Sequence, residues 1–91
     1  MQCKLGGKMW HFKFANMEDY GDCTDPGHAD GRLIRVRAKQ SERDMLDTII
    51  HEALHACTPL DEETVATTAT DITRLLWRLG YRRVATDECS P

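Results

Sequence analysis

Apolar and polar residues alternate in two short segments of the N-terminal half of the chain. A strand over Lys8–Phe14 would carry its aromatic residues on one face: Trp10, Phe12 and Phe14. A strand over Arg32–Ala38 would likewise gather apolar residues on one face: Ile34, Val36 and Ala38. Residues 16–31 between them are rich in Asp and Gly, which predicts a long loop.

Two longer segments of the C-terminal half have apolar residues at helical spacing. Ser41 is the expected N-cap of a helix over residues 42–57. Its apolar face, which we expect to lie on the sheet, consists of Leu46, Ile49, Ile50, Ala53 and Cys57. A second helix should begin at about Asp61 or Glu62 and end near Leu79, with Gly80 as its C′ residue. Its inward stripe consists of Val65, Ala69, Ile72, Leu76 and Leu79.

The predicted order of elements is strand, long loop, strand, helix, helix. This order favours an α+β fold in which a small antiparallel, hairpin-like sheet packs on two helices. The 91 residues are enough for one domain, which we expect to span the whole chain, 1–91. Residues 1–7 and 86–91 lack a clear pattern and are expected to be flexible termini.

The composition is that of an ordinary globular protein, with 41% hydrophobic and 30% charged residues. A net charge of −3 argues against nucleic acid as a partner. No segment has the length of apolar sequence that a membrane span or a signal peptide needs, so we expect a cytoplasmic protein. The four cysteines form no C-x-x-C pair and are expected to be free thiols, although a bridge between Cys3 and Cys89 stays open.

The strongest chemical signal is the segment His51-Glu52-Ala53-Leu54-His55, which has the H-E-x-x-H pattern of a zinc site. Histidines four positions apart lie one turn apart on the same side of a helix, so both imidazoles can reach one ion. We expect them to face away from the sheet. Glu52 would flank the metal and act as general base and then general acid.

A third ligand is expected at the start of the second helix. Glu62 continues the inward stripe of that helix, so it is the first candidate. Asp61 lies at the edge of the stripe and would serve as N-cap or as a substitute ligand. Glu63 and the loop residue His28 are further alternatives.

These residues give the chain a resemblance to the zincin superfamily of metallopeptidases. The likeness, from about Trp10 to Arg83, is to small phage-associated and bacterial proteins with D-T-I-I-H-E-A-L-H-A, L-D-E-E-T-V and L-L-W-R-L-G-Y-R segments. In general plan it is similar to minimal zincins of the SprT-like and ImmA/IrrE types. The resemblance implies Zn²⁺ on the two histidines with Glu52 as base. A glutamate as third ligand makes the site gluzincin-like, since Thr58 and Asp61 replace the Gly and His of metzincins.

The resemblance also implies how a substrate would bind. In zincins a strand above the metal helix pairs with the substrate at its edge, and residues 32–38 are the candidate here. Tyr81 or Arg82 is a candidate to stabilise the oxyanion. The expected function is therefore a zinc-dependent metallopeptidase, which hydrolyses a peptide or protein substrate with a zinc-bound water activated by Glu52. The alternative is a non-catalytic, zinc-stabilised binding or regulatory module, which has no use for Glu52.

Overall fold

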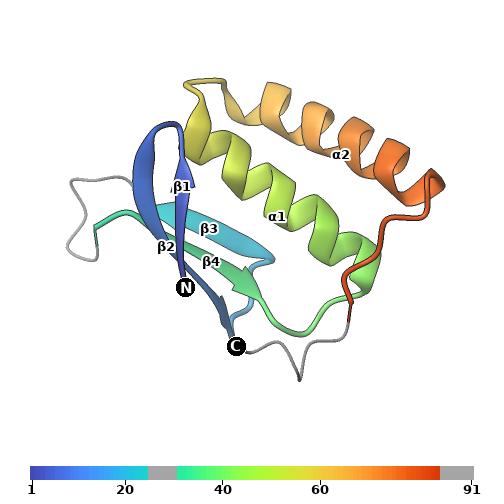
Figure 1. Ribbon diagram of the computed structural model, residues 1–91, viewed down its shortest axis with the longest axis horizontal. Coiled ribbons are helices and arrows are strands. Elements are labelled where there is room, and N and C mark those ends of the chain that lie inside the picture. The colour runs from blue at the N-terminus through green and yellow to red at the C-terminus, as the bar shows by residue number, and fades with distance from the viewer. Residues whose placement is uncertain (25–30, 85–91) are drawn as a thin grey trace.

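The strands of the described residues, 1–24 and 31–84, form one mixed sheet in the computed structural model (Figure 1). The elements in chain order are β1 (Gln2–Leu5), β2 (Lys8–Ala15), β3 (Gly21–Thr24), β4 (Leu33–Arg37), α1 (Glu42–Cys57) and α2 (Glu62–Arg78). The α+β class, the two predicted strands and the two predicted helices are confirmed. The segment 86–91 and the loop residue His28 lie outside the described residues.

The N-terminal segment 1–7 is not the irregular terminus that we expected. Its residues form β1, which pairs antiparallel with β2, with Cys3 opposite Trp10. Gly6 and Gly7 make the tight turn between the strands at φ values of +60° and +78°. Only glycine adopts such angles in succession at little cost, so the Gly-Gly pair selects the hairpin.

The predicted antiparallel pairing of the two central strands is wrong. β4 lies beside β2 in parallel, with Phe12 opposite Ile34, and the strand order is β1-β2-β4-β3. The connection between them is not all loop, because it contains β3, which pairs antiparallel with β4. β3 takes the chain back along the sheet, so β4 can enter between β2 and β3 in the direction of β2.

α1 lies on one face of this sheet and completes the core. Trp10, Ile34 and Val36 are buried there, and three half-buried residues of α1 pack against them: Met45, Ile49 and Ala56. The most deeply buried residues of α1 are Thr48 and Glu52, each 7% exposed. The predicted apolar face is therefore rotated by about one position, and Cys57, expected in the core, is exposed.

α2 packs on α1 and makes no contact with a strand, so the described part of the molecule has three layers, sheet, α1 and α2 (Figure 1). Its buried residues are Val65, Ala69 and Thr73, whereas Ile72 and Leu79 of the predicted stripe are exposed. Gly80 ends the helix as predicted, at a φ of +93°. The backbone N–H groups of Gly80 and Tyr81 bond the carbonyls of Trp77 and Leu76, both at 3.0 Å.

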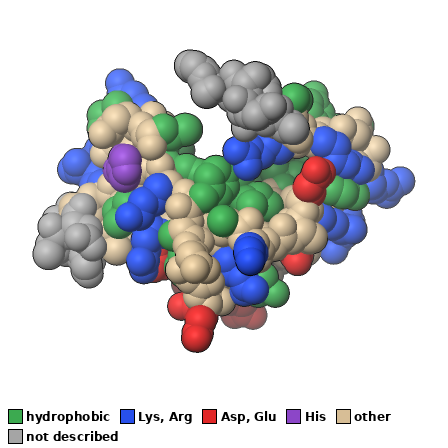
Figure 2. All heavy atoms as spheres, turned by 90° about the horizontal axis from the view of Figure 1, so that it is seen from below, with side chains coloured by type: hydrophobic (Ala, Val, Ile, Leu, Met, Phe, Trp, Pro, Cys, Tyr) green, Lys and Arg blue, Asp and Glu red, His purple; other side chains and the backbone are tan. Residues whose placement is uncertain are grey.

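The face of the sheet opposite α1 carries polar and charged residues. Arg35 bonds Asp22, with 2.9 Å between Nε and Oδ1, and Arg37 lies over the Tyr20 ring. Seen from below, Lys and Arg side chains surround a group of hydrophobic ones (Figure 2). Neither helix is both long and apolar enough to cross a bilayer, within the residues that the structure describes.

Candidate metal centre

The C-terminal half of α1, the start of α2 and the edge of the sheet enclose a cleft of about 760 Å³. Its lining from the two helices comprises His51, Glu52, His55, Ala56, Cys57 and Glu62. β3 contributes its first three residues, Gly21, Asp22 and Cys23. We had expected the histidines to face away from the sheet, and this expectation is wrong. They open into a space that β3 borders, because α1 is rotated relative to the predicted face.

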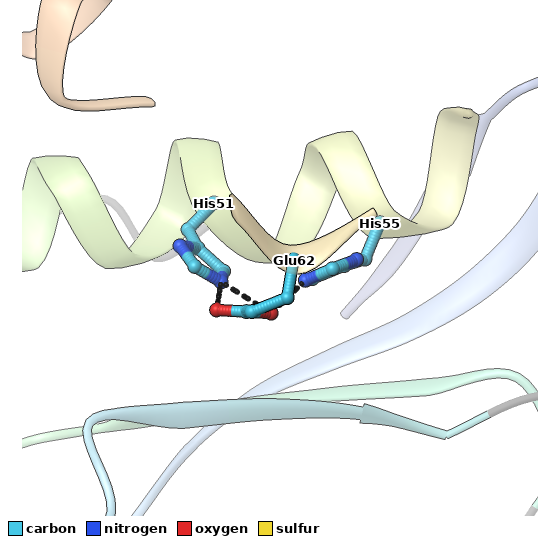
Figure 3. A group of neighbouring side chains, drawn as sticks. All are labelled: His51, His55 and Glu62. Carbon is cyan, nitrogen blue, oxygen red and sulfur yellow. Dashed lines mark hydrogen bonds and ion pairs between the residues drawn. The ribbon is translucent and has the colours of Figure 1, made fainter. Parts of the chain in front are cut away.

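Within this cleft, His51, His55 and Glu62 converge (Figure 3). The Glu62 carboxylate lies between the two imidazoles, with Oε1 2.7 Å from His55 Nε2 and Oε2 3.0 Å from His51 Nε2. The hydrogen bond with His55 lowers the pKa of the Glu62 carboxyl. An ionised carboxylate beside two imidazole nitrogens is a donor set suited to a cation.

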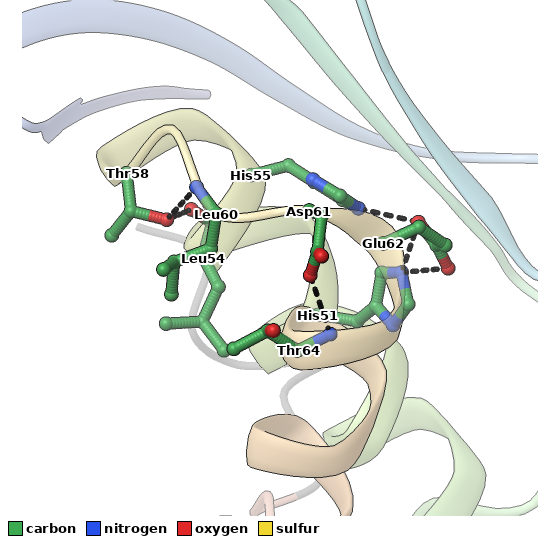
Figure 4. Close-up of polar contacts among 8 residues, drawn as sticks. All are labelled: His51, Leu54, His55, Thr58, Leu60, Asp61, Glu62 and Thr64. Carbon is green, nitrogen blue, oxygen red and sulfur yellow. Dashed lines mark hydrogen bonds and ion pairs between the residues drawn. The ribbon is translucent and has the colours of Figure 1, made fainter.

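The short connection between the helices positions Glu62 (Figure 4). The Thr58 hydroxyl donates to the carbonyl of Leu54 over 2.8 Å and holds the chain at the end of α1. Asp61 then caps α2, since its Oδ1 accepts a hydrogen bond of 2.9 Å from the backbone N–H of Thr64. Bonds from Thr64 also lower the pKa of Asp61. With Asp61 engaged as the cap, Glu62 is the first residue of the helix and reaches back to α1.

The alternative third ligands do not join the cluster. Asp61 serves as N-cap, and neither it nor Glu63 belongs to the group of possible ligand atoms. Within residues 1–24 and 31–84, His51, His55 and Glu62 form the one group of three or more potential ligands, and their ligand atoms all lie within 4.8 Å of one another. The Glu62 candidate is thus the one that the fold brings to the histidines.

The donor set fits a metal ion. In a tetrahedral site with zinc–ligand distances near 2.0–2.1 Å, neighbouring donor atoms are roughly 3.3 Å apart. The two imidazole nitrogens lie 2.7 Å and 3.0 Å from the nearest Glu62 oxygens, and the ligand atoms of the three residues all lie within 4.8 Å of one another, so they are close enough to bind one ion. Nitrogen and oxygen donors of this kind also bind other divalent transition metals, so the geometry indicates a metal and does not by itself select zinc.

Glu52 is the most unusual charged group of the cleft. It is only 7% exposed although it lies between the two histidines in sequence. No hydrogen bond to its carboxylate comes from any residue of the described part of the chain. Burial is the main cause of a raised pKa, which His51 and His55 partly offset. A buried, unpartnered carboxyl costs stability, and such groups are concentrated at functional sites.

Gly21 of β3 allows this arrangement. A Cβ atom built on Gly21 would lie 2.7 Å from Thr48 Cγ2 and 3.3 Å from Glu52 Cγ. α1 can therefore approach the edge strand closely only because this position has no side chain. The sequence around Gly21 gave no apolar alternation that would have revealed the contact.

Other predicted site residues lie elsewhere. Tyr81 and Arg82 line a second hollow, at the opposite end of the helix pair, where Arg82 stacks on Trp77 with its Cζ 3.3 Å from the ring centroid. They are therefore not placed to stabilise an oxyanion. The segment 32–38, expected to be an edge, contains β4, which is internal to the sheet and already paired on both sides.

Two residues on the inner face of the sheet also line the cleft, although the sequence did not indicate them as site residues. These are Trp10 of β2 and Arg32, which directly precedes β4. Side chains alternate along a strand, so Arg32 lies on the same face as the buried Ile34 and Val36. The same alternation places Arg35 and Arg37 on the other face, which could have distinguished Arg32 from them.

Comparisons of the chain with protein-family models, curated proteins and solved structures gave no match.

Proposed function

We propose that this protein is a zinc-dependent peptidase of the zincin type, in which His51, His55 and Glu62 hold the metal and Glu52 transfers protons. The observation that carries this proposal is the position of Glu52. A buried carboxyl, to which no described residue donates a hydrogen bond, lines the same cleft as three converging ligand groups. Metal binding alone gives no reason to bury a second carboxyl there. Kinship with small phage-associated zincins is part of the proposal and rests on the motifs alone.

Each side chain has a separate task. Zinc, when bound, would polarise the scissile carbonyl and lower the pKa of a water. Glu52 would accept a proton from the attacking water and later donate it to the leaving amine nitrogen, so that no proton is left over. Its raised pKa suits both steps, because the carboxyl then gives up and regains a proton closer to neutral pH.

The sheet offers an extended peptide one edge beside these groups. β3 is an outer strand in the order β1-β2-β4-β3, and its residues Gly21, Asp22 and Cys23 line the cleft. In this proposal the peptide backbone would pair with β3, and the carbonyl to be cleaved would face His51 and His55. The glycine at position 21 lets α1 bring Glu52 close to this strand.

A second function is favoured by a different observation. Among the described elements, α2 packs on α1 and on no strand, and a metal on Glu62 would join the two helices at one end. Zinc could then act as a structural clamp in a binding or regulatory module. Such a module needs the three ligands and has no need of Glu52.

The substitution Glu52→Gln separates the two functions. The amide keeps the size of the side chain and cannot carry the proton, so the variant should bind one zinc ion per chain while hydrolysis falls by about 10²–10⁴-fold. Zinc content is measured by elemental analysis, and hydrolysis by mass spectrometry of a defined peptide library. Glu63→Gln, which changes an exposed neighbour of Glu62, is the control and should match the parent. If Glu52→Gln cleaves peptides as fast as the parent, the peptidase proposal is wrong.

A further inference from the structure

Arg32 occupies an unusual place for an arginine. β2 and β4 pair in parallel with His11 opposite Leu33, and the backbone N–H of His11 donates to the Arg32 carbonyl over 2.9 Å. Side chains alternate along a strand, so Arg32 lies on the same face as Ile34, the face that α1 covers. The two following arginines, Arg35 and Arg37, lie on the opposite face. Arg32 is half-buried on this side of the sheet, and a cation that is partly removed from water calls for a compensating group.

The described residues do not supply that group. The Arg32 guanidinium forms no ion pair with a carboxylate in residues 1–24 and 31–84, and its Nε atom is buried without an acceptor. The neighbouring strand adds a second donor in the same condition. Trp10 is 6% exposed, lines the cleft, and its Nε1–H group is buried without an acceptor. Two hydrogen-bond donors without acceptors, on two residues that line the same cleft, indicate that an oxygen ligand belongs at this wall.

Three acidic residues line the cleft, and none of them forms an ion pair with Arg32. Asp22 is paired with Arg35, and Glu62 lies between His51 and His55. Neither therefore neutralises Arg32. The charges that act on the pKa of Glu52 are those of His51, His55, Asp22 and Glu62, and Arg32 is not among them. Lys8 adds another cation to the lining of the cleft. This wall is thus positive and rich in donors, whereas the wall formed by the helices carries the metal ligands.

We propose that Arg32 and Trp10 form a carboxylate subsite, which binds an anionic group of a peptide whose scissile bond lies at the metal centre. An arginine offers parallel N–H groups that match a carboxylate, and the indole N–H can donate to the same group. The carboxylate is either the C-terminal α-carboxylate or an Asp or Glu side chain. Because it names the substrate class of the same cleft, this inference rests on the proposed peptidase function.

Binding to the zinc-loaded Glu52→Gln protein tests the subsite without hydrolysis. The probes are acetyl-Ala-Ala-Ala and its C-terminal amide, and acetyl-Ala-Asp-Ala-amide and its Asn counterpart. Affinities come from calorimetry, and the indole N–H resonances report the site, with Trp77 as internal reference. At least one acid should bind about 10-fold more tightly than its neutral partner and shift the Trp10 resonance. The pair that shows the preference identifies the source of the carboxylate.

Substitution of the arginine must remove this preference. In the Glu52→Gln background, Arg32→Gln should bring acid and neutral peptides to equal affinity with unchanged zinc content, and Arg32→Lys should retain part of the preference. Lys13→Gln, on the outer face of the sheet, is the control and should keep it in full. The subsite is overturned if no probe binds, if acids and neutral peptides bind alike, or if Arg32→Gln keeps the preference. If the preference holds but the parent hydrolyses no peptide, the peptidase proposal fails and the subsite stands.

Discussion

The two ends of the α1–α2 pair are closed in different ways. At one end Glu62 faces His51 and His55, and the buried Glu52 lies beside them. At the other end the helices border a hollow of about 530 Å³ whose apolar lining includes Met45, Leu46, Ile49, Leu76 and Trp77. Here Arg82 stacks on the indole, and the backbone bonds of Gly80 and Tyr81 close α2.

The apolar end of the helix pair stabilises the fold, whereas the polar end carries the candidate metal centre. Apolar packing and a helix cap are stabilising without any ligand. The polar end, by contrast, buries the carboxyl of Glu52 and leaves donors without acceptors at Trp10 and Arg32. An end that carries such costs is the one that a ligand can stabilise most, so the proposed metal and substrate should act mainly here.

The largest expected effect is that of zinc on stability. Free zinc at about 1,000 times its Kd should raise the free energy of unfolding by about 4 kcal/mol, and a chelator should remove this gain. The gain should vanish in His55→Ala, which lacks a ligand, and persist in His11→Ala on the outer face of the sheet. Denaturant titration with and without chelator measures it. An equal response to zinc in His55→Ala would contradict the ligand assignment.

The opposite end provides the matched comparison for zinc. Leu76→Ala removes apolar packing and should destabilise the protein by a similar amount in zinc and in chelator. Hydrogen exchange should show that zinc protects the first turn of α2 more than the last one. Uniform protection along α2 would show that the two ends are not independent.

Much of this contrast could be predicted from the sequence. Helical spacing, the Ser41 cap and Gly80 located both helices, and the stripe that starts at Glu62 indicated the residue that the fold brings to the histidines. These signals are local, since capping and periodicity involve residues within a few turns of one another. The carboxylate neighbouring His51 was equally visible in the motif.

The remaining features depend on contacts that are distant in sequence. The rotation of α1 follows from the close approach to Gly21, which lets Glu52 and Thr48 face the sheet in place of more apolar neighbours. β3 has no hydrophobic alternation and is stabilised by its pairing with β4. β1 has a local signal of its own, the Gly6-Gly7 pair between two extended segments, although its four residues show no hydrophobic alternation strong enough to predict a strand.

An intermediate effect is expected from Gly21→Ala at the polar end. The new Cβ would meet Thr48 Cγ2 at 2.7 Å and the Arg35 carbonyl at 3.0 Å, so α1 or β3 must shift. Overpacking of this kind costs about 1–3 kcal/mol, measured by chemical denaturation. Adding Thr48→Ser removes the nearest methyl group and keeps the hydroxyl that donates to Gln40 Oε1, so it should restore part of the loss. A fully stable Gly21→Ala would refute the close approach.

The smallest expected effect is a gain in stability for Glu52→Gln in chelator. Burial raises the pKa of Glu52 above its ordinary value of 4.5, so above that pH the native state holds this proton more tightly than the unfolded chain does. The contribution of Glu52 to the free energy of unfolding is therefore fully present below about pH 4.5. It is lost as the pH rises through the folded-state pKa. A neutral amide avoids this loss. The metal-free variant should exceed the parent by about 1 kcal/mol near neutral pH, with no difference at acid pH.

Denaturant titrations of the metal-free parent, Glu52→Gln and Glu63→Gln across this pH range check the sign. Glu63 is exposed, so its substitution should leave the pH profile unchanged. A loss of stability in Glu52→Gln at neutral pH would mean that the ionised carboxylate has a stabilising partner in the fold. Glu52 would then stabilise the polar end, as apolar packing stabilises the opposite end, and the two ends would no longer differ in this respect. A gain would instead show that the fold tolerates an unfavourable carboxyl at the position to which we assign the proposed proton transfer.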